Sequence, residues 1–179
     1  MKPEHVLKFW FQDIDSKLWF KKDFEFDQKV RELFAETYKN TLAGNYSDWR
    51  KTPPGRLAEI IVLDQFSRNI FRDSPEGFSG DALALELASE AVNTGDDQKI
   101  QIERRAFIYL PFMHSEDKLV HEKAVQLFSQ KGLEKNFEYE LAHKKIIDRF
   151  GRYPHRNKIL GRISTDEEIE FLKEAGSSF

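Results

Sequence analysis

The chain has 179 residues, of which 40% are hydrophobic and 13% aromatic, so it can build an apolar core and is not expected to be disordered. It contains no cysteine, which excludes disulfides and thiolate chemistry. Its formal net charge of −3 argues against a general nucleic-acid binder, which needs a broad basic face. No apolar run is long enough for a membrane helix or a signal peptide. We therefore expect a soluble cytoplasmic protein with no membrane partner, in which residues 1–179 form a single all-α domain.

Apolar residues recur at helical spacing along most of the chain, and no segment shows the alternation that is typical of a strand. This pattern predicts an all-α fold of about eight helices in antiparallel pairs joined by short turns. No internal sequence repeat is visible. The predicted helices cover residues 3–11, 23–43, 53–72, 80–93, 97–110, 115–132, 136–150 and a last helix from about 164.

Local signals predict where several of these helices begin and end. We expect Ser79 and Ser115 to cap the starts of the fourth and sixth helices. Pro111 is expected to end the fifth helix, and Gly151 the seventh. Residues 164–167 have the composition of a capping box and should open the last helix.

The third predicted helix is mostly apolar but carries a polar arc. Its polar residues fall within an arc about 140° wide, at roughly 100° per residue. Polar side chains on a buried helix must be hydrogen-bonded. The arc therefore predicts either a structural network that ties this helix to its neighbours or one wall of a ligand pocket. Its members are Asp64, Gln65, Arg68, Asn69 and Arg72.

A turn between the fifth and sixth helices places His114 beside Glu116 and Asp117. The two carboxylates are explained by the first turn of a helix, where the dipole favours negative charge. His114 is less easily explained, because neighbouring carboxylates can favour its protonated form or orient its ring. His114 and Glu116 could also be two metal ligands, although their spacing is not diagnostic of a metal site.

Residues 143–162 form a cationic stretch in an acidic chain. They include seven Lys or Arg residues and one Asp, a formal charge of +6, so the rest of the chain carries −9. Guanidinium groups bind carboxylate or phosphate through two parallel hydrogen bonds. The alternative is that these arginines pair with acidic residues elsewhere on the surface. The candidate residues are His143, Arg149, Arg152, His155, Arg156, Asn157 and Arg162.

Taken together, the blocks 63–72, 109–117 and 149–162 resemble the signature blocks of the bacterial domain-of-unknown-function 924 family. The resemblance extends over essentially the whole chain. Ser67 stands where proline is expected, and Tyr153 where phenylalanine is usual. The resemblance implies a tetratricopeptide-repeat-like helical fold and implies no activity.

Three functional hypotheses follow. The first is a site for a small anionic metabolite, with a hydrolase or lyase reaction if there is turnover. In that hypothesis His114, Glu116 and His155 are the catalytic candidates. The ligand-binding candidates are Asp64, Gln65, Arg68, Asn69, His143, Arg149, Arg152, Arg156, Asn157 and Arg162.

The second hypothesis is a scaffold that binds an acidic peptide or protein through the cationic stretch. The third is that the polar motifs form internal ion pairs and serve structure alone. We expect no cofactor, no metal and no nucleic-acid partner, since the acidic surface would repel a long polyanion.

Overall fold

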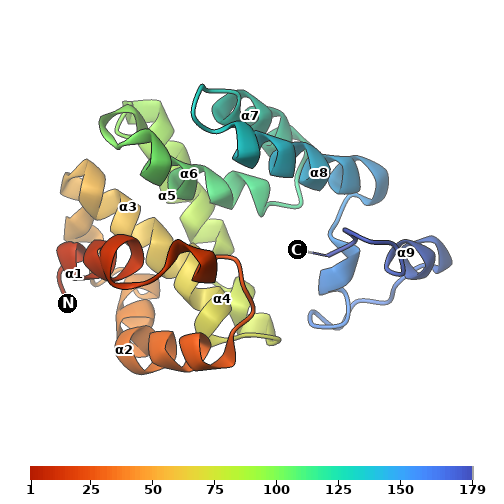
Figure 1. The fold of residues 1–179 in the computed structure, drawn as a ribbon, viewed down its shortest axis with the longest axis horizontal. Helices are drawn as coiled ribbons and strands as arrows, with labels where there is room; N and C mark the ends of the chain where they lie inside the picture. The colour runs from red at the N-terminus through yellow and green to blue at the C-terminus, as the bar shows by residue number, and fades with distance from the viewer. Residues whose placement is uncertain (179) are drawn as a thin grey trace.

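The structure is a computed structural model that describes residues 1–178, and every regular element in this range is helical, which confirms the predicted all-α fold (Figure 1). The α-helices are α1 (Pro3–Lys8), α2 (Phe24–Leu42), α3 (Pro53–Ile61), α4 (Ser67–Ile70), α5 (Asp81–Thr94), α6 (Ile102–Met113), α7 (Lys118–Phe128), α8 (Glu134–Phe150) and α9 (Asp166–Phe171). Two stretches are π-helical, η1 (Phe9–Asp13) and η4 (Val62–Phe66). Short 3₁₀ turns are η2 (Ser16–Leu18), η3 (Ser47–Lys51), η5 (Pro75–Phe78), η6 (Asp97–Lys99) and η7 (Pro154–Arg156).

Several helix ends follow from local chemistry. The Asp23 side chain accepts a hydrogen bond from the backbone N–H of Phe26 and so caps α2. Helix α3 begins at Pro53, where the missing amide hydrogen costs nothing because first-turn amides have no helical acceptor. Helix α8 ends at Gly151, whose φ of 70° is the left-handed conformation that glycine adopts without strain.

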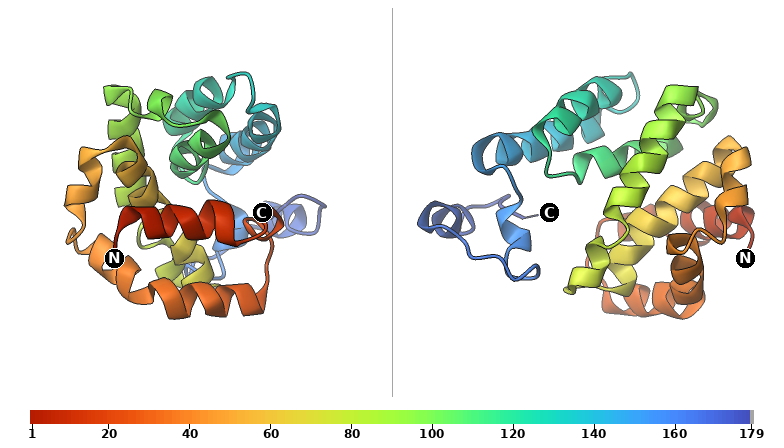
Figure 2. Two further views of the ribbon diagram at one scale, coloured as in Figure 1. Left: turned by 60° about the vertical axis from the view of Figure 1, so that its left-hand side comes forward. Right: turned by 180° about the vertical axis from the view of Figure 1, so that it is seen from behind.

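The helices pack into a continuous body with an aromatic core. Helix α1 packs on α3, α2 packs on α4 and η4, and α5 to α8 follow one another as packed neighbours (Figure 2). The largest fully buried side chains include Trp10 and Phe66, whose ring centroids lie 5.4 Å apart. The indole of Trp10 also meets the ring of Phe107 edge-on, at 5.9 Å. Burial of these rings, together with the aliphatic side chains around them, stabilises the body.

Residues 151–178 form a segment that we call the C-terminal arm. It leaves the end of α8, turns through η7 and ends in α9, which lies at the opposite end of the molecule from α1 (Figure 1). A second, smaller apolar cluster joins the arm to α8, with Ile146, Ile147 and Tyr153 buried at its centre. The arm therefore has little apolar packing of its own, and polar contacts carry much of its attachment.

The predicted limits of the fifth helix were wrong. Residues 97–99 form a 3₁₀ turn, and the α-helix covers Ile102–Met113 with Pro111 inside it. An internal proline removes one helical hydrogen bond and costs roughly 3 kcal/mol in an exposed helix. Here the chain from Ala106 to Met113 is buried, so packing of this segment against its neighbours outweighs the local penalty.

Three predicted caps also differ. Gly80, and not Ser79, precedes α5, and it makes no side-chain cap. Asp117 caps α7 by accepting a hydrogen bond from the Leu119 backbone, so Ser115 and Glu116 lie outside that helix. The capping box of α9 is Thr165 with Glu168, one residue later than predicted. At α7 and α9 a nearby residue of similar chemistry takes the role, and at α5 no side chain does; helix ends are uncertain by one or two residues from sequence alone.

Candidate functional site

The π-helical stretch η4 interrupts the long helix that runs from Pro53 to Ile70 and gives the site its first wall. A π-helical turn is wider than an α-helical turn and is often found at functional sites. The turn contains Asp64 and Gln65, both of which are buried. The Gln65 amide donates a hydrogen bond to Oδ2 of Asp64, 2.6 Å away. The polar arc predicted on this helix therefore begins with a carboxylate held inside the protein.

Asp64 pairs with His114, which follows α6. Its Oδ1 lies 2.7 Å from Nδ1 of the imidazole. Burial alone would raise the pKa of Asp64, but Arg68 and His114 lower it below its usual range. Burial lowers the pKa of His114, and the attraction of Asp64 only partly opposes this effect. The pair is therefore an ionised carboxylate and a neutral imidazole at neutral pH, with the Nδ1 hydrogen donated to Asp64.

The other nitrogen of the ring points away from this pair. Nε2 of His114 makes no hydrogen bond within residues 1–178, and the side chain is 15% exposed. Because Nδ1 carries the hydrogen, Nε2 carries the lone pair. The ring therefore keeps a potential proton acceptor at Nε2.

Arg68 lies one helical turn after Asp64 and binds a second carboxylate. Its guanidinium donates to Oδ1 and Oδ2 of Asp81 at 2.9 and 3.1 Å, and to the backbone oxygen of Asp64 at 2.6 Å. Asp81 is brought there by a close approach of the two chain segments, because a Cβ atom on Gly80 would lie 2.6 Å from the Leu63 backbone oxygen. Only glycine fits at that contact, so Gly80 sets the distance between α5 and η4.

Arg156 comes from the arm and completes the cluster. Its Nη1 donates to the backbone oxygen of His114 at 3.0 Å. Its guanidinium contacts two aromatic rings, 4.4 Å from the ring centroid of Tyr153 and 5.0 Å from that of Phe78. Cation–π contacts of this kind stabilise a desolvated arginine by about 2 kcal/mol or more.

The charge of Arg156 is only weakly compensated. The side chain of Arg156 is 9% exposed, and the nearest carboxylate oxygen with which it pairs, Oδ2 of Asp81, is 3.9 Å away. Its Nε is buried and has no hydrogen-bond partner. Burial lowers the pKa of Arg156, and the neighbouring charge of Arg68 lowers it further. A buried cation of this kind normally has a bonded anion, so this guanidinium is the least satisfied charge of the cluster.

Other predicted site residues form ion pairs within the chain. Arg162 binds Glu116 through two hydrogen bonds of 2.6 and 2.9 Å, and Glu116 also accepts from the Tyr153 backbone at 2.8 Å. Arg152 donates twice to Glu168, at 2.6 and 2.7 Å. These contacts join the arm to the body and to its own last helix.

Two further candidates lie with these pairs or at some distance from Asp64. The amide of Asn157 donates to Glu168, so it belongs to the arm network. The exposed guanidinium of Arg149 pairs with Glu167. Asn69 donates to Asp27, which also binds Arg72, so these two members of the polar arc fasten α4 to α2.

His143 and His155 lie near the cluster in partly or fully buried positions. Nδ1 of His143 lies 2.7 Å from the Tyr139 backbone oxygen. Burial lowers the pKa of His143 to about 3. Burial and the charge of Arg156 lower the pKa of His155 to about 4. Both rings are therefore neutral at neutral pH.

Sequence reasoning missed several residues of the site. Asp81 has no distinguishing signal, because an acidic residue in a first helical turn is common. Phe78 and Tyr38 look like ordinary core residues, yet the Tyr38 hydroxyl is buried without a hydrogen-bond partner. Burial and the charge of Asp81 raise the pKa of Tyr38.

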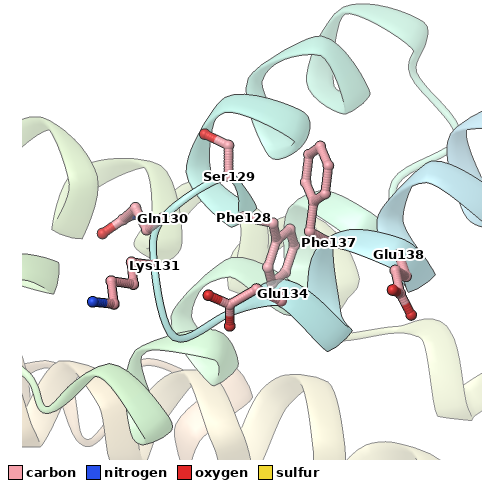
Figure 3. Close-up of a pocket in the computed structure, with 7 residues that line it drawn as sticks. All are labelled: Phe128, Ser129, Gln130, Lys131, Glu134, Phe137 and Glu138. Carbon is pink, nitrogen blue, oxygen red and sulfur yellow. The ribbon is translucent and has the colours of Figure 1, made fainter.

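Two surface pockets lie away from this cluster. One, of about 420 Å³, lies between the end of α7 and the start of α8 and includes Phe128 and Phe137 in its lining (Figure 3). The other, of about 350 Å³, lies beside α2 and includes Asp13 and Phe26. Within residues 1–178, no three His, Cys, Asp or Glu side chains meet in the way that a metal site requires. In that same range, no helix is both long and apolar enough to cross a membrane.

The fold and the cluster together define an all-helical protein with a buried aspartate–histidine pair beside two arginines. The chain matches the family described as "Bacterial protein of unknown function (DUF924)" over residues 6–176, and it belongs to this family. It is also similar to a solved structure of a protein of unknown function, ATU0120 from Agrobacterium tumefaciens. The two share 34% sequence identity with a TM-score of 0.92, and the match covers 97% of each chain. No curated protein matches the chain.

Proposed function

We propose that the cluster of Asp64, Arg68, Asp81, His114 and Arg156 binds a small anionic molecule. The observation that carries this proposal is the guanidinium of Arg156, which is buried, has an Nε without an acceptor and lies 3.9 Å from the carboxylate with which it pairs. An anion bound beside it would neutralise this charge. Arg68 is the second cation of the site. Its guanidinium already donates to both carboxylate oxygens of Asp81.

His114 gives the same site a means of proton transfer. An ionised aspartate that accepts from Nδ1 fixes the tautomer of the imidazole and stabilises the imidazolium that forms when Nε2 takes up a proton. Asp64 meets this requirement at 2.7 Å, and Gln65 and Arg68 hold its carboxylate in place. A hydrolase or lyase reaction on a carboxylated or phosphorylated molecule would use His114 as general base.

An acidic peptide or protein partner on a tetratricopeptide-repeat-like scaffold has less support. Such a partner needs a row of unpaired cations. Three of the four arginines in the cationic stretch, Arg149, Arg152 and Arg162, are already bound to carboxylates of the chain. Arg156 is the exception, and its burial suits a small ligand better than an extended one.

The test is a thermal-shift screen with acetate, malonate, phosphate and sulfate. A ligand that binds only the folded protein stabilises it by about 2.7 kcal/mol at 100 times its dissociation constant. For a chain of this size we expect a rise in the melting temperature of about 5–10 °C. The rise should be lost in Arg156→Gln and kept in the matched control Arg149→Gln, which changes an exposed guanidinium.

Two outcomes would reject the proposal. An equal shift in both variants would mean that the anion binds elsewhere. A flat screen, with Arg156→Gln melting well below Arg149→Gln, would mean that Arg156 serves to hold the arm and not a ligand.

A further inference from the structure

The turn that carries His114 is held by an unusual set of contacts. The last carbonyl groups of a helix have no backbone N–H donor within the helix, so they need donors from elsewhere. At the end of α6, three consecutive carbonyls, those of residues 113–115, each receive a side-chain hydrogen bond. Met113 accepts from the Tyr153 hydroxyl at 2.5 Å, His114 from Arg156 at 3.0 Å, and the Ser115 oxygen lies 2.9 Å from Nε2 of His121.

His121 is itself part of a fully buried pair. Its Nδ1 lies 2.7 Å from Oε1 of Glu140, and both side chains are completely buried. His121 belongs to α7 and Glu140 to α8, so the pair links two helices to the turn. The pair could not be predicted from the sequence, because a histidine and a glutamate 19 positions apart have no diagnostic spacing.

The surrounding oxygens determine where the hydrogen atoms lie. Nε2 of His121 faces the Ser115 carbonyl and, at 3.2 Å, the Tyr153 hydroxyl. The carbonyl can only accept, and the hydroxyl hydrogen is already donated to the Met113 carbonyl, so Nε2 must carry a hydrogen. A second hydrogen must then lie between Nδ1 and Oε1 of Glu140, because two lone pairs at 2.7 Å would repel each other.

Glu140 is the natural holder of this second hydrogen. Its other oxygen, Oε2, is buried and has no hydrogen-bond partner. An ionised carboxylate would leave negative charge on that oxygen without compensation. Burial accordingly raises the pKa of Glu140, although His121 opposes the shift.

We infer that His121 and Glu140 are positioning residues for His114. They share a proton that keeps Nε2 of His121 a hydrogen-bond donor. This donor fixes the turn that aims His114 at Asp64. This inference rests on the proposed function, because the position of His114 matters for activity only if His114 acts as the general base. Its evidence is independent, however, because it concerns the geometry of the ligand-free protein. The imidazole of His121 touches no part of the candidate ligand site and acts only through the Ser115 carbonyl and Tyr153.

The experiment compares two variants that differ in which imidazole nitrogen they replace. His121→Gln places an amide donor near the position of Nε2 and can keep the bond to the Ser115 carbonyl. His121→Asn is shorter, reaches the position of Nδ1 and loses that bond. The readout is NMR of ¹⁵N- and ¹³C-labelled histidine without any ligand, which gives the tautomer and the pKa of His114.

In wild type and His121→Gln we expect His114 to hold its hydrogen on Nδ1. In His121→Asn the turn is released, so we expect a tautomer mixture and a pKa of His114 that rises toward its ordinary value near 6.5. Glu140→Gln should resemble wild type, because its amide can donate to Nδ1 of His121. Leu127→Ala is the stability control, since it opens a cavity in α7 without touching the turn.

The inference is overturned if His114 keeps its tautomer and pKa in His121→Asn, or if Leu127→Ala shifts them equally. It also fails if the spectrum of the wild-type protein shows no hydrogen on Nε2 of His121, a result that requires no variant to fold. None of these outcomes depends on anion binding, so a failure here is distinguishable from a failure of the proposed function.

Discussion

The body and the C-terminal arm are held together by different kinds of interaction. In the body, aromatic rings such as Trp10, Phe66 and Phe107 are packed with ring centroids about 5–6 Å apart and almost no exposure. The arm has a small apolar cluster around Tyr153 and depends otherwise on hydrogen bonds and ion pairs, among them the pair of Glu116 with Arg162.

The candidate site therefore lies at the boundary between a region held by apolar packing and a region held by polar contacts. Asp64 and His114 belong to the body, while Arg156 belongs to the arm. Apolar packing is insensitive to pH and holds the aspartate–histidine pair in place. The polar contacts of the arm respond to pH and charge, so we expect the arm to detach under milder conditions than those that unfold the body.

The largest expected effect comes from the body. Trp10→Ala should lower the free energy of unfolding by about 3–5 kcal/mol, since it removes a fully buried indole and leaves a cavity. Thermal unfolding should show a melting temperature lower by roughly 10 °C or more. Phe24→Ala is the control, because its ring is 80% exposed and should cost less than about 0.5 kcal/mol. Similar losses in the two variants would contradict the view that aromatic burial stabilises the body.

A smaller effect is expected where the arm meets the body. Glu116→Ala removes both hydrogen bonds to Arg162 and the acceptor for the Tyr153 backbone. We expect a loss of about 2 kcal/mol, below the range for fully buried pairs because both side chains are about a quarter exposed. Hydrogen exchange should accelerate in residues 151–178 and stay unchanged in α1 to α5.

The matched control for this change is Glu167→Ala. Glu167 pairs with Arg149, and their side chains are 63% and 45% exposed. Exposed pairs contribute less than about 1 kcal/mol, so exchange in the arm should barely change. Uniform acceleration of exchange over the whole chain in Glu116→Ala would show that the arm and the body unfold as one unit. The two regions would then not differ in stability.

Much of the fold could be predicted because its signals are local. The 3.6-residue periodicity, Asp23 before α2 and Gly151 after α8 act within a few residues of where they stand. Pro111 was misjudged because tertiary burial overrides a local penalty. The π-helical turn at Asp64 was also missed, because apolar periodicity does not separate one π-helical turn from the α-helix around it.

The site could be predicted only in part. The pairing of Asp64 with His114 joins positions 50 residues apart, and sequence indicated that both were unusual without indicating that they meet. Asp81 and His121 gave no signal, since their roles depend on the close approach at Gly80 and on burial between α7 and α8. The arginines of the cationic stretch all looked alike in sequence, and only the positions of the carboxylates separate Arg156 from the rest.

The smallest loss of stability per side chain is expected when mild acid protonates buried histidines. The pKa of His143 is lowered to about 3 and that of His155 to about 4, chiefly by burial, against an ordinary value near 6.5. Below about pH 6.5 these two rings take up protons in the unfolded chain but not in the folded chain. The free energy of unfolding is therefore highest above that pH and falls as the pH decreases toward the pKa values of the folded protein. The loss should be about 1 kcal/mol for each ring by pH 6, measured by urea unfolding at pH 7.5 and 6.

Mild acid also separates the two regions, because both rings lie where the arm meets the body. Protonation of His155 puts a second charge beside Arg156, so exchange in residues 151–178 should accelerate before that in α1 to α5. Glu168, whose pKa Arg152 lowers to about 2, adds its loss only below about pH 4.5. Constant stability from pH 7.5 to 5.5 would mean that these rings are solvated in solution, and the boundary would then not be the pH-sensitive part of the molecule.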